Sequence, residues 1–233
     1  MIVPIILMVT GGISLAWFLM EKIKAYSIKA VCIKALTSLL FIALGVHCLL
    51  NTYLKYLSIF ILIGLIFGLA GDILLDLKYV YREKDYPFTL AGFIAFGVGH
   101  IFYITGMLLE FFHDQNILYI IIPFGVGLLI ALGTILTEKI LKTNYGKLKL
   151  TAFLYAITLF SMVSIAFSMW MMTGFHNNGL LMLFIGGILF AISDLILNMT
   201  YFAENHEKPF DIISNSITYY AAQFIIAFAI LFL

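Results

Sequence analysis

Apolar stretches of roughly 20 residues follow one another from one end of this chain to the other. A helix of about this length crosses the ~30 Å hydrocarbon core of a bilayer, where every backbone polar group has to be satisfied within the protein. Hydrophobic residues make up 64% of the 233 positions and charged residues only 11%, too few to cover a soluble domain. The sequence therefore predicts an all-α polytopic membrane protein, with one transmembrane helical domain over 1–233.

Eight spans are predicted, and they are joined by short connections. Their approximate ranges are 2–20, 31–50, 53–77, 87–112, 116–136, 149–172, 178–202 and 211–233. No basic segment precedes the first apolar stretch, so we expect it to be a retained span and not a cleaved signal peptide.

Lysine and arginine are distributed unevenly between the two sides of the predicted bundle. The connections at 21–30, 78–86, 137–149 and 203–210 hold eleven of them, and the opposite connections hold only Lys55. Basic connections stay in the cytoplasm, which predicts that both termini lie outside it, in a bacterial cytoplasmic membrane. The net charge of +1 gives no reason to expect nucleic acid, so membrane lipids are the expected surroundings.

Four ionisable residues are predicted well inside the spans: Lys34, Asp72, His100 and Asp194. A charge at the membrane centre costs at least about 3 kcal/mol, so such residues are functional candidates by default. The alternative interpretation is a structural ion pair or hydrogen-bond network between helices. For Lys34, an equally good explanation is that its long side chain snorkels, extending its ammonium group to the membrane surface.

The predicted depths of these groups are similar. Lys34, Asp72 and Asp194 fall in the inner half of the membrane, and His100, Tyr219 and Gln223 fall near its middle. A shared depth predicts a water-filled pocket that opens toward the cytoplasmic leaflet. Asp76 lies one turn beyond Asp72 and is predicted to be a hydrated residue at the rim.

Small residues repeat at helical spacing ahead of the two aspartates. Gly64 and Gly68 share a face with Asp72, and Gly186 shares a face with Asp194. Small residues let a neighbouring helix approach closely, so the aspartates are expected to point into the bundle. The segments GLIFGLAGDILLD (64–76) and GGILFAISDLILN (186–198) are also alike, which suggests a parallel 4+4 internal repeat. Chance similarity between apolar segments is the alternative.

These residues also resemble the YhhN-like membrane protein family, which includes the eukaryotic lysoplasmalogenases. The resemblance rests on GD in the third span and on Phe96, Gly99, His100, Tyr103, Gly187, Phe190, Ser193 and Asp194. Tyr155, Gln223 and Lys34 also fit, although Ala35 stands where the family usually has proline. The resemblance covers nearly the whole chain. It implies a lysophospholipid substrate, a lysoplasmalogen, whose vinyl ether bond is hydrolysed to give a fatty aldehyde and a glycerophospho-alcohol.

Such hydrolysis begins with protonation of carbon, which requires an acid that is still protonated near neutral pH. Burial disfavours the anion of a carboxyl group, and a second carboxylate stabilises the cation that forms. Asp72 and Asp194 are therefore predicted to be a catalytic dyad. Lys34 is expected to pair with the substrate phosphate or with an aspartate, and His100 and Tyr103 to orient water or the headgroup. The other predicted substrate-binding residues are Tyr155, Ser193, Asn198, Tyr219 and Gln223.

No cofactor is expected. A metal site is the less favoured alternative, because only His47 and His100 lie inside spans and zinc hydrolases need several converging ligands. The rival functional class is a transporter or channel in which Asp72, His100 and Asp194 relay protons or bind a small cation. A lipid-binding protein without catalytic activity is a third class, and fatty aldehyde release from a lysoplasmalogen distinguishes the first class from both others.

Overall fold

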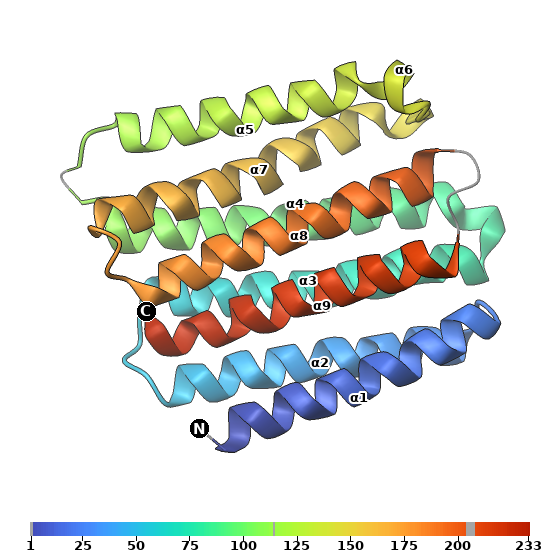
Figure 1. Ribbon diagram of the computed structural model, residues 1–233, viewed down its shortest axis with the longest axis horizontal. Helices are drawn as coiled ribbons and strands as arrows, with labels where there is room; N and C mark the ends of the chain where they lie inside the picture. The colour runs from blue at the N-terminus through green and yellow to red at the C-terminus, as the bar shows by residue number, and fades with distance from the viewer. Residues whose placement is uncertain (1, 114, 204–207) are drawn as a thin grey trace.

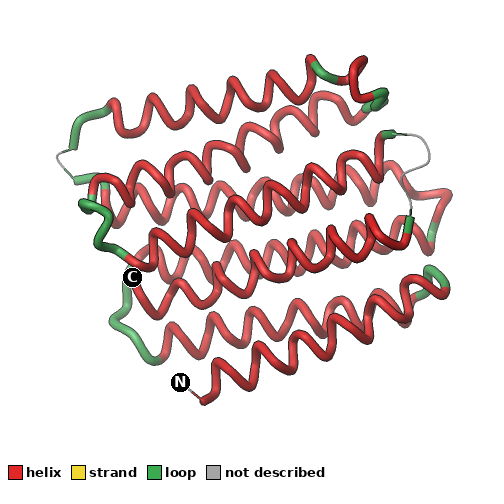
Figure 2. Tube along the Cα trace, in the orientation of Figure 1, coloured by secondary structure: helices red, strands yellow, loops and turns green. Residues whose placement is uncertain are grey.

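The computed structural model describes residues 2–113, 115–203 and 208–233, and its regular elements in these ranges are helices (Figure 2). Eight helices in this part of the chain are long and apolar enough to cross a membrane. They are α1 Ile2–Lys24, α2 Ile28–Leu50, α3 Tyr56–Val80, α4 Asp85–Phe111, α5 Leu118–Leu136, α7 Lys149–Met172, α8 Asn178–Phe202 and α9 Pro209–Ala229. The prediction of an all-α, eight-helix membrane protein is confirmed.

The first connection differs most from its prediction. The helices α1 and α2 leave only residues 25–27 between them, because the polar residues predicted to form a connection continue α1. Ser27 then caps α2, and its side chain accepts a hydrogen bond from the Ala30 N–H at 3.2 Å. As a result, Lys22 lies on a helix and not in a loop.

Short helical turns occupy two of the basic connections. They are η1 Arg82–Lys84 before α4, and α6 Glu138–Leu141 with η2 Gly146–Leu148 before α7. Glu138 accepts hydrogen bonds from Lys149 Nζ and from the Tyr145 N–H, which hold the pKa of Glu138 below its usual range. This connection buries the side chain of Tyr145.

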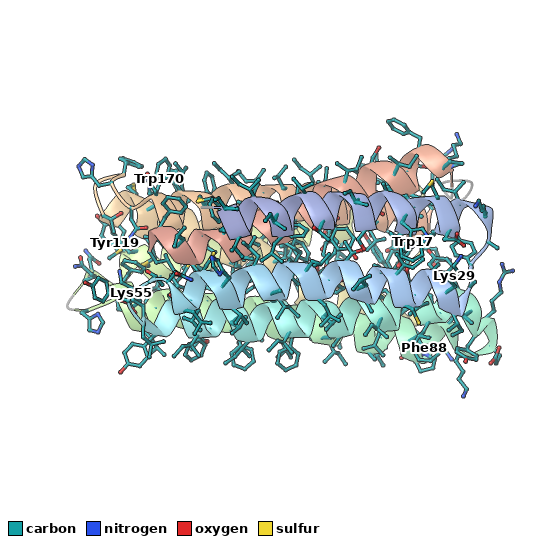
Figure 3. All side chains as sticks on the ribbon, turned by 90° about the horizontal axis from the view of Figure 1, so that it is seen from below. Trp17, Lys29, Lys55, Phe88, Tyr119 and Trp170 are labelled. Atoms are coloured by element: carbon teal, nitrogen blue, oxygen red, sulfur yellow. The ribbon has the colours of Figure 1, made fainter. Side chains whose placement is uncertain are left out.

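The helices run side by side and alternate in direction (Figure 1). The helix α5 forms one edge and packs mainly on α7, and α1 forms the other edge beside α2. Between them, α3 packs closely on α4 and α8 packs closely on α9. Both ends of the chain lie at the same end of the bundle as Lys55, whereas Lys29 lies at the opposite end (Figure 3). Which end faces the cytoplasm stays a prediction.

Glycines mark the closest helix contacts, as their spacing predicts. A Cβ at Gly64 would overlap the ring of Tyr103 in α4. A Cβ at Gly68 would lie 2.7 Å from Gln223 Nε2 in α9, and one at Gly186 would lie 2.7 Å from Ile226 Cγ1. Both aspartates are consequently held on helix faces that their neighbours can approach closely.

The two halves of the chain pack in corresponding ways. The helices α3 and α8 each have 25 residues, and in both the aspartate stands sixteen residues after the first. The helix α3 packs on α2 and α4, and α8 packs on α7 and α9, while α2–α9 and α4–α7 contacts join the halves. These pairs correspond to one another under a twofold exchange of the halves, whereas the packing of α1 on α9 has no comparable α4–α5 counterpart among the described residues. The internal duplication itself stays a prediction.

Candidate active site

Asp72 lies at the centre of a buried polar cluster between α2, α3 and α9. Its Oδ2 accepts hydrogen bonds from Ser38 Oγ at 2.6 Å and from Tyr219 OH at 2.8 Å. The Nζ of Lys34 lies 3.4 Å from its Oδ1. With 1% of its surface exposed, Asp72 is shielded from solvent but surrounded by donors, which is the arrangement that makes a buried carboxylate tolerable.

Asp76 belongs to the same cluster, and the prediction that it is a hydrated rim residue is wrong. Its exposed fraction is 5%, and its Oδ1 lies 2.7 Å from Lys22 Nζ and 3.4 Å from Lys34 Nζ. The physical reason is the length of α1, which continues past its apolar part and brings Lys22 beside α3. Two lysines and two aspartates thus balance one another in charge.

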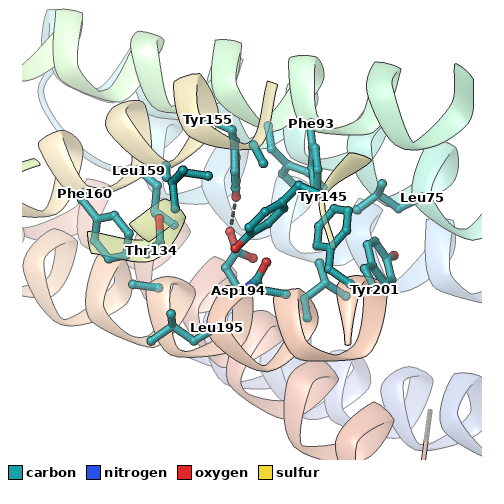
Figure 4. Close-up of a pocket in the computed structure, with 18 residues that line it drawn as sticks. Leu75, Phe93, Thr134, Tyr145, Tyr155, Leu159, Phe160, Asp194, Leu195 and Tyr201 are labelled. Atoms are coloured by element: carbon teal, nitrogen blue, oxygen red, sulfur yellow. Dashed lines mark hydrogen bonds between the residues drawn. The ribbon is translucent and has the colours of Figure 1, made fainter. Parts of the chain in front are cut away.

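Asp194 has different surroundings, although it stands at the corresponding place in α8. Its Oδ2 accepts a hydrogen bond from Tyr155 OH of α7 (Figure 4). No lysine or arginine within residues 2–113, 115–203 and 208–233 forms an ion pair with it. Where α2 supplies a lysine to Asp72, the corresponding helix α7 supplies a phenol to Asp194.

Both aspartates line one hollow, which we call the polar cavity. It is also lined by Lys34, Ser193 and Tyr219. Six groups were predicted to share one site because of their common depth. Four of them, Lys34, Asp72, Asp194 and Tyr219, line this cavity, whereas His100 and Gln223 do not.

Asp194 also lines a second hollow, which we call the apolar cavity. Its walls include Phe93, Leu159, Phe160 and Tyr145 (Figure 4). The two cavities have Leu75, Phe96, Asp194, Leu197 and Tyr201 in common, so they are adjacent. The apolar cavity draws lining residues from α5 and α8, two helices that pack on α7 and not closely on each other. Asp194 therefore stands where an apolar space meets a polar one.

Five of the other predicted substrate-binding residues line one of the two cavities. Lys34, Ser193 and Tyr219 line the polar cavity, and Tyr155 and Asn198 line the apolar cavity.

The remaining three predicted substrate-binding residues lie behind the cavity walls. His100 and Tyr103 line neither cavity, and neither does Gln223, whose Nε2 donates to Tyr219 OH at 2.8 Å. His100 is 1% exposed, and its Nε2 lies 3.5 Å from Tyr155 OH. The structure thus places His100 and Gln223 one step behind the aspartates, each in contact with a tyrosine that binds one of them.

Sequence reasoning missed several members of the polar cluster. Lys22 was assigned to a connection, and Ser38 and Tyr220 were not singled out. In the structure, Ser38 Oγ lies 3.1 Å from Tyr220 OH. Ser38 follows Lys34 by four residues and Asp76 follows Asp72 by four. Positions four apart share a helix face, so this spacing was an available signal. For Lys22 the only signal was the helix-favouring composition of EKIK.

No group of three or more His, Cys, Asp and Glu side chains that could hold a metal ion is found in the part of the chain that the structure describes. The acidic groups of the polar cluster are engaged by lysine, serine and tyrosine donors.

The sequence profile of the YhhN family matches residues 29–230, which include α2 to α9 and both aspartates but not Lys22. No curated protein and no solved structure matches the chain.

Proposed function

The chain belongs to the YhhN family, and on this premise we propose that it is an intramembrane hydrolase that cleaves the vinyl ether bond of lysoplasmalogens. The products are a fatty aldehyde and a glycerophospho-alcohol. The observation that carries this proposal is the pair of aspartates with unlike surroundings around one cavity, beside an apolar space for a hydrocarbon chain.

The reaction needs one proton donor and one group that stabilises positive charge. The acid protonates the β-carbon of the vinyl ether, and the electrons of the double bond form the new C–H bond. The α-carbon and the ether oxygen then share a positive charge. Water adds to the α-carbon and returns a proton to the carboxylate, and the hemiacetal breaks down to aldehyde and alcohol. A carboxylate fixed near the developing cation lowers the barrier, because a fixed charge in a water-poor site needs no reorganisation.

The surroundings of the two aspartates support one assignment of these roles. Asp72 is held by Lys34, Ser38 and Tyr219, donors that stabilise a carboxylate anion. Asp194 has a phenol as its hydrogen-bond partner on Oδ2, which leaves Oδ1 to carry a proton. We therefore assign the acid to Asp194 and the charge-stabilising carboxylate to Asp72. Tyr155 is a positioning residue that fixes the orientation of Asp194.

The proposal is tested by incubating the purified protein with a lysoplasmalogen and measuring fatty aldehyde. Asp72→Asn and Asp194→Asn should each lower kcat by at least about 100-fold, the scale of general acid catalysis. Glu110→Gln is the matched control, because Glu110 accepts a hydrogen bond from the Tyr56 N–H, far along the sequence from either aspartate. Proton transfer to carbon should also slow turnover severalfold in heavy water. Full activity in both asparagine variants would remove the aspartates from the mechanism.

A second function is favoured by the corresponding packing of the two halves. Some secondary transporters consist of parallel repeats with ion sites at the repeat interface, and Asp72 and Asp194 lie on corresponding helices. In this alternative the aspartates bind a proton or a small cation in turn. Proteoliposomes that enclose a pH-sensitive dye would report proton flux. Flux that is lost in Asp194→Asn, together with absence of aldehyde release, would replace the hydrolase proposal.

A further inference from the structure

A chain of hydrogen bonds leads from Gln223 to Asp72, and its direction is fixed. Tyr219 OH donates to Asp72 Oδ2 at 2.8 Å, and Gln223 Nε2 donates to Tyr219 OH at 2.8 Å. A phenol has one proton to donate, and an amide nitrogen cannot accept it. The other end of the amide, Gln223 Oε1, has no hydrogen-bond partner among the described residues. The amide therefore keeps the tyrosine proton on the aspartate.

The similar chain that leads to Asp194 begins at an imidazole. Tyr155 OH donates to Asp194 Oδ2 (Figure 4), and His100 Nε2 lies 3.5 Å from Tyr155 OH. His100 Nδ1 has no hydrogen-bond partner in the part of the chain that the structure describes. An imidazole nitrogen donates or accepts depending on which of the two ring nitrogens carries the proton. The direction of this chain therefore depends on the tautomer of His100.

Aromatic packing holds the imidazole and the phenol in place. Phe93 stacks on Tyr155 with ring centroids 5.4 Å apart, and the rings of Phe190 and His100 meet edge to face at 4.8 Å. His100 is 1% exposed, and within residues 2–113, 115–203 and 208–233 it forms no ion pair with an acidic side chain. A charged imidazolium would be buried there without a counterion, which favours the neutral ring with a single proton.

The protons of a neutral imidazole, a phenol and a protonated carboxyl group can be arranged in two ways. In the first, His100 Nε2–H donates to Tyr155 OH, the phenol donates to Asp194 Oδ2, and the acid proton is on Oδ1. In the second, the acid proton is on Oδ2 and binds the phenol oxygen, the phenol donates to Nε2, and the imidazole proton on Nδ1 meets no acceptor among the described residues. Only the first arrangement persists after Asp194 has given up its proton, because the phenol then still donates to the carboxylate.

We propose that His100 is a positioning residue, which donates from Nε2 to Tyr155 and thereby keeps the phenol proton on Oδ2 and the acid proton on Oδ1 of Asp194. This inference rests on the proposed function. His100 lines neither cavity, so it acts through Tyr155 and does not touch the substrate. When Asp194 protonates the β-carbon, the phenol already donates to the carboxylate that forms, and no group has to reorient.

The tautomer of His100 can be measured without any substrate. The full chain is labelled with ¹⁵N-histidine and reconstituted in lipid vesicles, and solid-state NMR correlates each ring nitrogen with its proton. The spectrum of His100→Gln identifies the His100 signals among those of the five histidines. We expect the proton on Nε2 in the wild type and a shifted Nε2–H resonance in Tyr155→Phe, which has no phenol oxygen to accept it. A proton on Nδ1 in the wild type would overturn the proposal, as would an Nε2–H resonance that Tyr155→Phe leaves unchanged.

Single variants test whether the donor matters for proton transfer. His100→Leu should lower kcat for aldehyde release about fivefold with KM nearly unchanged, as for the loss of one hydrogen bond. His100→Gln should retain most of the wild-type kcat, because an amide donates in the same way to Tyr219. Thr105→Val is the matched control on α4 and should keep full activity, since Thr105 Oγ1 donates to the Ile101 carbonyl of its own helix and lines neither cavity.

The double variant His100→Leu/Tyr155→Phe distinguishes positioning from general damage to the fold. If His100 acts only through Tyr155, the double variant should be about tenfold slower than the wild type, as Tyr155→Phe alone is expected to be. Independent effects would multiply to about fiftyfold. Such multiplication, or a His100→Gln variant as slow as His100→Leu, would overturn the proposal. If the wild type releases no aldehyde, the hydrolase proposal falls, and the NMR result still decides the direction of the chain.

Discussion

Replacement of Lys34 by methionine should destabilise the fold, because it leaves one buried carboxylate, that of Asp72, without a paired lysine. Lys34 Nζ lies 3.4 Å from both Asp72 and Asp76, and no other lysine or arginine of the described residues is paired with Asp72. Asp76 keeps Lys22 at 2.7 Å. Methionine retains the length and apolar stem of lysine, so Lys34→Met removes the charge with little change in packing.

The size of the effect follows from these distances. At 3.4 Å and an effective dielectric constant of about 20, one ion pair contributes about 5 kcal/mol of Coulomb energy. The variant no longer has to dehydrate the lysine, and this gain offsets part of the lost Coulomb energy. Loss of one partner from a buried pair typically costs about 3–5 kcal/mol. Ser38 and Tyr219 still donate to Asp72 in the variant, and Asp72 can also take up a proton. Because both effects reduce the cost of the unpaired carboxylate, we expect the lower end of this range, about 3 kcal/mol. For a chain of this size, this corresponds to a fall in Tm of roughly 6–12 °C.

A thiol-reactive dye provides the assay, because Cys48 is fully buried and becomes reactive only on unfolding. Cys32 is exposed and is replaced by serine in every variant. The double variant Lys34→Met/Asp72→Asn leaves Lys22 and Asp76 as a balanced pair and should recover most of the lost Tm. A double variant less stable than Lys34→Met alone, or a single variant within about 2 °C of the wild type, would refute the charge-balance argument.

The remaining predictions concern the acid, helix packing and orientation. Tyr155→Phe removes the hydrogen bond that positions the proposed acid, so kcat for aldehyde release should fall about tenfold with KM nearly unchanged; an equal fall in Tm would make the tyrosine structural instead. Gly127→Ala should lower Tm, since its Cβ would lie 2.6 Å from a backbone nitrogen of α7, whereas Gly125→Ala, with nothing within 4 Å, should leave Tm equal or higher. In intact cells with a cysteine-free background, an impermeant thiol reagent should label Tyr53→Cys and not Lys147→Cys; the reverse pattern would invert the predicted orientation.

The pattern of apolar runs determined the fold class, the number of spans and the approximate positions of Asp72, Asp194, Lys34 and Tyr219 along their helices. These quantities depend on distance along a helix, which the sequence contains directly, because each residue adds ~1.5 Å of rise. The glycine faces of α3 and α8 were readable for a similar reason, since positions four apart lie on the same side of a helix. Asp72, Asp194, Lys34 and Tyr219 were accordingly singled out, and the structure places all four around one cavity.

Only the tertiary structure decided which polar groups become partners. Asp76 and Asp72 are one turn apart, and nothing in that spacing indicates that Lys22 of α1 reaches one while Ser38 of α2 reaches the other. The same holds for Asp194, whose lack of a paired cation among the described residues distinguishes it from Asp72 despite a similar local sequence. Partners are set by the rotation of each helix about its axis and by which helices lie beside it. These depend on the close packing of side chains from distant parts of the chain, which is a three-dimensional property that hydrophobic periodicity does not encode.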